Sequence, residues 1–128
     1  MDHAPTLHRR RAVPAALWTG QALLALAFVG AGWPKVSGDP AMVDMFARIG
    51  AGQWLRYLVG ALELAGAVGL LVPRLRGLAA LGLSALLVGA TVTNVAVLHE
   101  SPVIPLCFLL FSAAIAAARL MRRNSWDA

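Results

Sequence analysis

The chain is too apolar and too poor in charged residues for an ordinary soluble domain of its size. Of its 128 residues, 59% are hydrophobic and 13% are charged, whereas soluble domains are roughly 45–50% apolar and about one quarter charged. A soluble fold of this length would expose much of that apolar surface to water. The composition therefore predicts a protein embedded in a lipid bilayer.

The charge and the cysteine content exclude several classes of site. The formal net charge is +5, but the basic residues form short clusters between apolar stretches, so we expect no nucleic-acid partner. The single cysteine, Cys107, excludes an intramolecular disulfide and a CxxC motif. The chain has three histidines and no GxGxxG, Walker or HExxH motif, so we expect no metal site and no covalently bound cofactor.

Four stretches of 23, 17, 23 and 18 residues carry no formal charge, apart from Glu63 in the second. A helix needs about 17–25 residues to cross a bilayer, so each stretch is long enough. The predicted membrane helices cover about 15–34, 57–73, 77–98 and 102–118. The last two connections are short, which favours antiparallel neighbours. The expected fold is therefore all-α, an antiparallel bundle of four transmembrane helices over residues 15–118, with a basic tail at 1–14 and a second tail at 119–128.

The distribution of basic residues predicts how this bundle is oriented. Eight of them fall on the side that holds both termini, namely Arg9, Arg10, Arg11, Arg74, Arg76, Arg119, Arg122 and Arg123. The other three fall on the opposite side, namely Lys35, Arg48 and Arg56. The positive-inside rule then places both termini in the cytoplasm, with the protein in the inner (plasma) membrane. The aromatic residues agree, with Trp18 and Trp126 near the inner interface and Trp33, Trp54 and Tyr57 near the outer one.

The first connection, residues 35–56, is long enough to hold a short amphipathic helix. Asp39-Pro40 is a typical helix start. Apolar residues then recur at helical spacing, and they are Met42, Met45, Phe46 and Ile49. Asp44 and Arg48 lie on the other face. We expect an interfacial helix on the outer membrane surface, which either shields the outer end of the bundle or acts as a lid.

Glu63 is the residue that least fits its surroundings. It follows Tyr57 by six positions, which places it about 9 Å below the outer interface at the rise of an α-helix. An acid at that depth normally faces the bundle interior or a water-filled cavity. Its neighbours on the same helical face are small, namely Gly60, Gly66 and Ala67. Either another helix packs closely against this face, or a cavity lies beside it.

Three other polar residues are expected near the depth of Glu63. Lys35 ends the first span, Asn94 lies about five residues inside the third, and His99 closes the third. We expect Lys35, Glu63, Asn94 and His99 to converge in the outer half of the bundle as a polar binding site. The inner half is expected to hold little that is polar beyond Ser84 and Ser112.

Each of these residues also has a simpler interpretation. Lys35 is either an interfacial anchor or an ion-pair partner of Glu63. Asn94 is either a hydrogen-bonding contact between helices or a ligand contact. His99 is a turn residue beside water. The repeat of Gly82, Gly89 and Ala96 every seven residues predicts a seam for close helix packing along the third span.

Several of these features together resemble the DoxX-like family of small four-helix membrane proteins. The resemblance rests on three stretches, FVGAGWPK at 28–35, the Asp39-Pro40 segment, and LELAG at 62–66. The resemblance covers roughly residues 15–118. It implies an association with quinone-linked redox systems, such as the small subunit of a thiosulfate:quinone oxidoreductase, and with membrane complexes that respond to oxidative stress. It also implies that Lys35 and Glu63 are the functional positions.

Three functions remain open on this basis. The first is a non-catalytic or accessory subunit of a quinone-linked redox system, with quinone as its ligand and partner redox subunits as the source of electrons. The second is a membrane anchor or assembly protein for partner subunits, in which Lys35 and Glu63 form a fold-defining pair. The third and weakest is a small proton or cation transporter, because the sequence shows no internal inverted repeat. Catalysis and homo-oligomer formation are undecided by the sequence.

Overall fold

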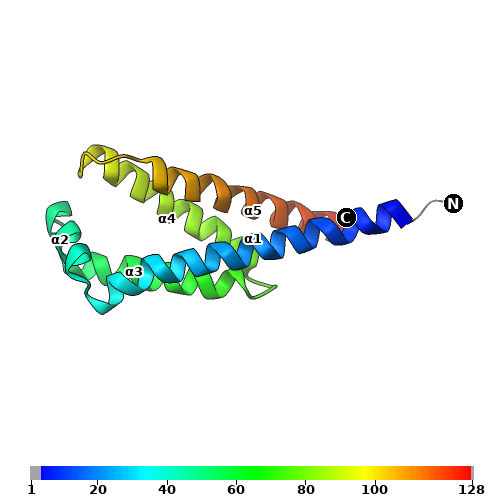
Figure 1. The fold of residues 1–128 in the computed structure, drawn as a ribbon, viewed down its shortest axis with the longest axis horizontal. Coiled ribbons are helices and arrows are strands. Elements are labelled where there is room, and N and C mark those ends of the chain that lie inside the picture. Colours follow the sequence, from blue (N-terminus) through cyan, green and yellow to red (C-terminus); the bar gives the residue numbers. More distant parts are fainter. Residues whose placement is uncertain (1–3, 128) are drawn as a thin grey trace.

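The computed structural model describes the backbone of residues 4–127 and the side chains of residues 14–122. Within this range the protein is all-helical, without strands, which confirms the all-α part of the prediction (Figure 1). The helices are α1 (Ala4–Ser37), α2 (Pro40–Ile49), α3 (Gln53–Leu70), α4 (Arg76–Ala96) and α5 (Val103–Asp127). The side chains of Arg9, Arg10, Arg11, Arg123 and Trp126, on which part of the predicted orientation rests, lie outside the described residues.

The long helices form two antiparallel pairs. α1 packs against α3, α4 packs against α5, and α3 also contacts α4. In Figure 1 the two pairs lie close together near the α3–α4 connection and diverge toward the other end, where α2 lies. The short α2 packs against α3 and α1. The bundle is therefore wedge-shaped, with its wide end beside α2.

The interior of the bundle is a narrow core of small and medium apolar side chains. Its buried members are Leu24, Ala25, Phe28, Ala67, Leu70, Ala80, Leu83, Leu87, Ile115 and Ala116. Many large apolar side chains lie on the outside instead, and Leu26, Val68 and Ile104 are each more than 60% exposed. A continuous apolar exterior is stable only in a nonaqueous solvent. This distribution fits helices that face lipid.

Among the residues that the structure describes, three helical segments are long and apolar enough to cross a membrane. They are Pro14–Ser37, Arg76–Ala96 and Val103–Arg122. Helical structure continues beyond the predicted spans, because α1 begins at Ala4 and α5 ends at Asp127. Pro5 in the first turn of α1 is compatible with helix, since an amide donor has no partner there.

The ends of α2 follow the sequence closely. The helix begins at Pro40 with Asp39 as its N-cap, which confirms the predicted start. Gly50 ends it in the left-handed conformation with φ of 85°, which glycine adopts without steric cost. α1 continues through Pro34 and ends at Ser37 before Gly38, whose φ is 82°.

The prediction that α4 packs closely against another helix along Gly82, Gly89 and Ala96 is wrong for the two glycines. A Cβ atom added to Gly82 or Gly89 would meet no heavy atom within 4 Å. A seven-residue repeat selects one face of a helix, but it does not determine whether that face meets another helix. The close contact between α3 and α4 is made by glycines of α3, since a Cβ on Gly69 would lie 2.8 Å from the Cβ of Ala79.

The expectation that the inner half holds little polar material is also wrong. Gln21 and Arg119 are both buried there, and Arg119 Nε donates a hydrogen bond to Gln21 Oε1 at 2.5 Å. Gln21 Nε2 in turn donates to the carbonyl oxygen of Leu70 at 2.6 Å. A single glutamine inside a long apolar stretch gives no charge signal, so the charge pattern did not reveal it.

Candidate functional site

A crossing of two glycines brings α1 and α3 together near the wide end. A Cβ on Gly32 would lie 2.9 Å from the carbonyl oxygen of Gly60, and one on Gly60 would lie 2.9 Å from the Cβ of Lys35. Real Cβ atoms do not approach other atoms this closely, so the two backbones can touch only because both residues lack a side chain. The small face around Glu63 therefore has a close helix neighbour, as one of the two sequence interpretations required.

Directly beside this crossing, Lys35 and Glu63 form a buried ion pair. Lys35 Nζ lies 2.8 Å from Glu63 Oε1, and the two side chains are 14% and 7% exposed. Lys35 Nζ also donates to the carbonyl oxygen of Ala31 at 3.0 Å. An unpaired charge at this position would carry a large desolvation cost, and each residue removes that cost for the other. Of the two interpretations of Lys35, the geometry shows the ion pair.

Arg56 is a buried member of the site that sequence reasoning missed. Only 4% of it is exposed, and its Nη1 donates to the backbone carbonyl oxygen of Lys35. Its Nε donates to Gln53 Oε1 at 2.7 Å, and Gln53 Nε2 donates to the carbonyl oxygen of Val43 at 3.1 Å. The guanidinium also stacks over the ring of Tyr57 at 4.2 Å. Arg56 and Gln53 thus tie α3 to the end of α1 and to α2.

A cavity of about 480 Å³ opens beside the ion pair. Its lining comes from all five helices and from Leu98 in the segment that joins α4 to α5. Most lining side chains are apolar, and the polar ones are Lys35, Glu63, Thr93 and Asn94. The cavity therefore combines an apolar interior with one charged pair and two neutral hydrogen-bonding groups. The cavity lies at the wide end of the wedge, where the two helix pairs diverge (Figure 1).

The apolar face of α2 forms part of the cavity wall. Met45, Phe46 and Ile49 all line the cavity, and Phe46 is buried. On the other face, Arg48 Nη2 lies 2.8 Å from Glu100 Oε1 in the α4–α5 connection. α2 therefore covers the wide end and joins the two helix pairs across it. Its apolar residues were recognised from their spacing, but the surface that they contact is decided by the neighbouring helices.

The structure brings three of the four predicted site residues to one cavity. Lys35, Glu63 and Asn94 line it, and His99 does not. Asn94 Nδ2 donates to the carbonyl oxygen of Ser101 at 3.1 Å, so it also holds the α4–α5 connection. His99 is exposed in that connection with φ of 53°.

The chemistry available at this site is proton exchange and hydrogen bonding in an apolar setting. A carboxyl group accepts or donates a proton, and an ammonium group donates up to three hydrogen bonds. Within the described residues, no group of three or more histidine, cysteine, aspartate or glutamate side chains is arranged to hold a metal ion. The arrangement suits a ligand with an apolar body and a polar head that carries hydrogen-bond acceptors.

Comparison with known proteins identifies the family. The sequence profile described as the DoxX-like family matches residues 19–120, which include every helix of the bundle in whole or in part. No curated protein and no solved structure matches the chain. The matched region also contains Lys35, Glu63 and the whole cavity lining. The chain belongs to the DoxX-like family and is a membrane protein with several candidate spans.

Proposed function

We propose that the protein is an accessory membrane subunit of a quinone-linked redox system and that its cavity holds the head of a quinone. The observation that carries the proposal is the buried Lys35–Glu63 pair on the wall of an otherwise apolar cavity. A charged pair is costly to keep in such a place. A polar ligand head that uses both groups gives a functional reason for that cost.

The cavity suits a quinone in size and in chemistry. Its volume of about 480 Å³ lies within the range of roughly 300–1,000 Å³ that small-molecule sites occupy. Lys35 uses two of its three N–H donors, on Glu63 and Ala31, which leaves the third for a carbonyl oxygen of the ligand. Glu63 is positioned to hold or release a proton, and the apolar lining of α2 and α5 suits an isoprenoid tail. When bound, a quinone supplies reversible uptake of two electrons and two protons.

The electrons in this proposal come from partner redox subunits. The sequence holds no flavin fingerprint, no cysteine cluster and no pair of membrane histidines. The chain's own contribution is to bind the quinone head, to exclude water from it and to provide a proton-carrying group at Glu63. This is the role of an accessory subunit and not of a complete oxidoreductase.

The proposal includes a fourth membrane crossing by α3. Its 18 residues span about 27 Å, and α3 packs between α1 and α4. Gln53, Arg56 and Glu63 lower its mean hydropathy, yet Arg56 and Glu63 are buried and hydrogen-bonded inside the protein. The side chains that α3 exposes are apolar or aromatic, for example Leu58, Leu62 and Val68. By the positive-inside rule, the end with Arg74 and Arg76 then faces the cytoplasm and α2 lies at the outer surface of the plasma membrane.

Quinone retention tests the proposal directly. The full-length protein would be purified in a mild detergent from cells that make quinone, and bound quinone would be measured by lipid extraction and mass spectrometry. We expect quinone with the wild type and at least a tenfold loss with Glu63→Gln, because one hydrogen bond to a charged group is worth about 1.5–3 kcal/mol. Asp44→Asn is the matched control, since Asp44 is an exposed acid at the same end of the bundle and lies outside the cavity lining.

The same experiment separates the proposal from an anchor or assembly function. That second function is favoured by one observation, the position of Lys35 and Glu63 at the closest contact of α1 with α3, which by itself explains the pair as structural. A wild type that binds neither native quinone nor an added short-chain quinone, and a Glu63→Gln variant that loses folded protein or partner subunits, would replace the quinone proposal with this one.

A further inference from the structure

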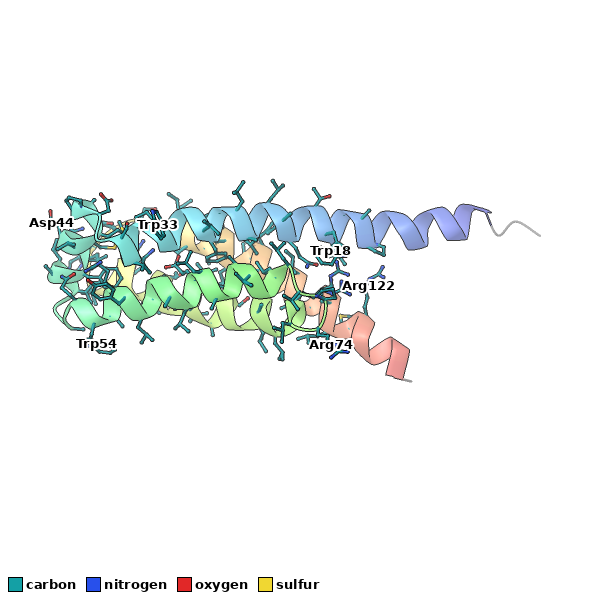
Figure 2. All side chains as sticks on the ribbon, turned by 90° about the horizontal axis from the view of Figure 1, so that it is seen from below. Trp18, Trp33, Asp44, Trp54, Arg74 and Arg122 are labelled. Atoms are coloured by element: carbon teal, nitrogen blue, oxygen red, sulfur yellow. The ribbon has the colours of Figure 1, made fainter. Side chains whose placement is uncertain are left out.

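A second pocket lies at the opposite, narrow end of the bundle. Its volume is about 690 Å³, and we call it the arginine pocket after the four arginines that line it, Arg74, Arg76, Arg119 and Arg122. Figure 2 shows Arg74, Arg122 and Trp18 at this end, with Trp54 and Asp44 at the other. The quinone proposal does not use this pocket.

Arg119 is built into the protein and still has an unused donor. It is only 5% exposed, and its Nε is held by Gln21, which is itself anchored to the carbonyl oxygen of Leu70. Its Nη2 is buried and has no hydrogen-bond partner among the residues that the structure describes. A buried donor without a partner is costly. This nitrogen therefore points to a hydrogen-bond acceptor that lies outside the described residues.

The charges around Arg119 favour an anion over a neutral acceptor. The positive charges of Arg76 and Arg122 both repel that of Arg119. Over residues 14–122, no aspartate or glutamate lines the pocket. Arg76 and Arg119 also both lie near the ring of Trp18, at 5.4 and 5.7 Å from its centroid. An anion in the pocket would relieve this repulsion and pair with guanidinium groups whose geometry matches phosphate oxygens.

We propose that the arginine pocket binds the phosphate headgroup of an anionic membrane lipid. The pocket lies where the candidate spans Arg76–Ala96 and Val103–Arg122 end, which is the depth of lipid headgroups. Its wall combines the arginines with Leu78, Leu120 and Trp18, and Leu78 is 55% exposed at the outside of the bundle. A phosphate in the pocket thus has apolar surface beside it for acyl chains. Basic pockets between membrane helices bind anionic lipid headgroups in this way.

Native mass spectrometry of the detergent-solubilised, full-length protein tests this proposal. The protein would be titrated with phosphatidylglycerol and, separately, with phosphatidylcholine of the same acyl chains. We expect the wild type to bind phosphatidylglycerol at least tenfold more tightly. Arg76→Gln is expected to reduce that preference about tenfold, the effect of losing one charge-assisted hydrogen bond. Arg48→Gln removes the same charge at the other end of the bundle and is expected to leave the preference unchanged.

The variant Arg74→Gln and the probe inorganic phosphate distinguish lipid binding from a folding defect and from the binding of a soluble phosphate compound. Arg74→Gln is expected to weaken the preference as well, and it is the safer variant for folding because Arg74 is exposed. Equal binding of the two lipids by the wild type, or an unchanged preference in both variants, would overturn the proposal. Inorganic phosphate that binds the wild type and depends on Arg76, without a preference for phosphatidylglycerol, would overturn the lipid as the ligand and assign the pocket to a soluble phosphate compound. Failure here has no bearing on quinone retention.

Discussion

A carboxylate inside an apolar helix needs a partner, and Glu63 has one in Lys35. The pair is nearly enclosed, and it lies on the wall of the cavity, not in its centre. Removing either charge leaves the other buried and unpaired, which costs more than the pair itself contributes. The two residues are therefore coupled in stability.

Single and double substitutions at the pair test this coupling. Lys35→Met and Glu63→Leu are each expected to lower the free energy of unfolding by about 3–5 kcal/mol, because each leaves one buried charge alone. The double variant is expected to lose less than either single variant, since no charge remains. Steric trapping in bicelles would measure all four proteins. Additive losses in the double variant would show that the two residues do not act as a pair.

At the level of helices, the contact of α1 with α3 depends on two residues without side chains. Gly32 and Gly60 face one another at van der Waals contact of their backbones, and this places Lys35 against Glu63. α2 is then held to the same two helices through Gln53 and Arg56. The ion pair is thus positioned by helix packing.

An alanine at the crossing tests its importance. Gly60→Ala is expected to lower the free energy of unfolding by about 1–3 kcal/mol, because its Cβ would lie 2.8 Å from Val36 Cγ2 and must push α1 away. Thermal unfolding in mild detergent, followed by circular dichroism, would measure the change. Gly30→Ala on α1 is the control, since its Cβ would meet nothing within 4 Å. Equal Tm values for the two variants would contradict the crossing.

For the whole molecule, the two ends of the wedge differ in charge. At the wide end Lys35 and Arg48 are each paired with an acid. At the narrow end the described charged side chains are arginines. Such asymmetry across a membrane protein predicts one orientation, with the arginine end in the cytoplasm.

Cysteine labelling in intact cells tests both the orientation and the fourth crossing. Cys107→Ser removes the native thiol, and Ala51→Cys and Leu75→Cys then place single thiols at the two ends of α3. A membrane-impermeant maleimide is expected to label position 51 in intact cells and position 75 only after lysis. The background variant without cysteine is the control. The reverse pattern would invert the orientation, and labelling of both positions from outside would show that α3 does not cross.

The sequence was informative wherever a single residue departed from its apolar background. Glu63 stood out for that reason, and Lys35 could be placed near it by depth alone. The helix start at Asp39-Pro40 was equally local, because it depends on the conformation of two residues. Gln21 and Arg56 were not recognised, since an uncharged amide and an arginine near a span end do not reveal that they are buried.

The sequence by itself determined the helical architecture and the family, because helix length, apolar content and the scarcity of charges act locally along the chain. The tertiary structure alone decided which faces meet. It directed the apolar side of α2 into a cavity, left open space beside Gly82 and Gly89, and gathered four arginines around a second pocket. Those outcomes depend on the rotation and crossing of helices distant in sequence. Several faces of each helix are similarly apolar, so periodicity does not distinguish the face that packs from the face that meets lipid.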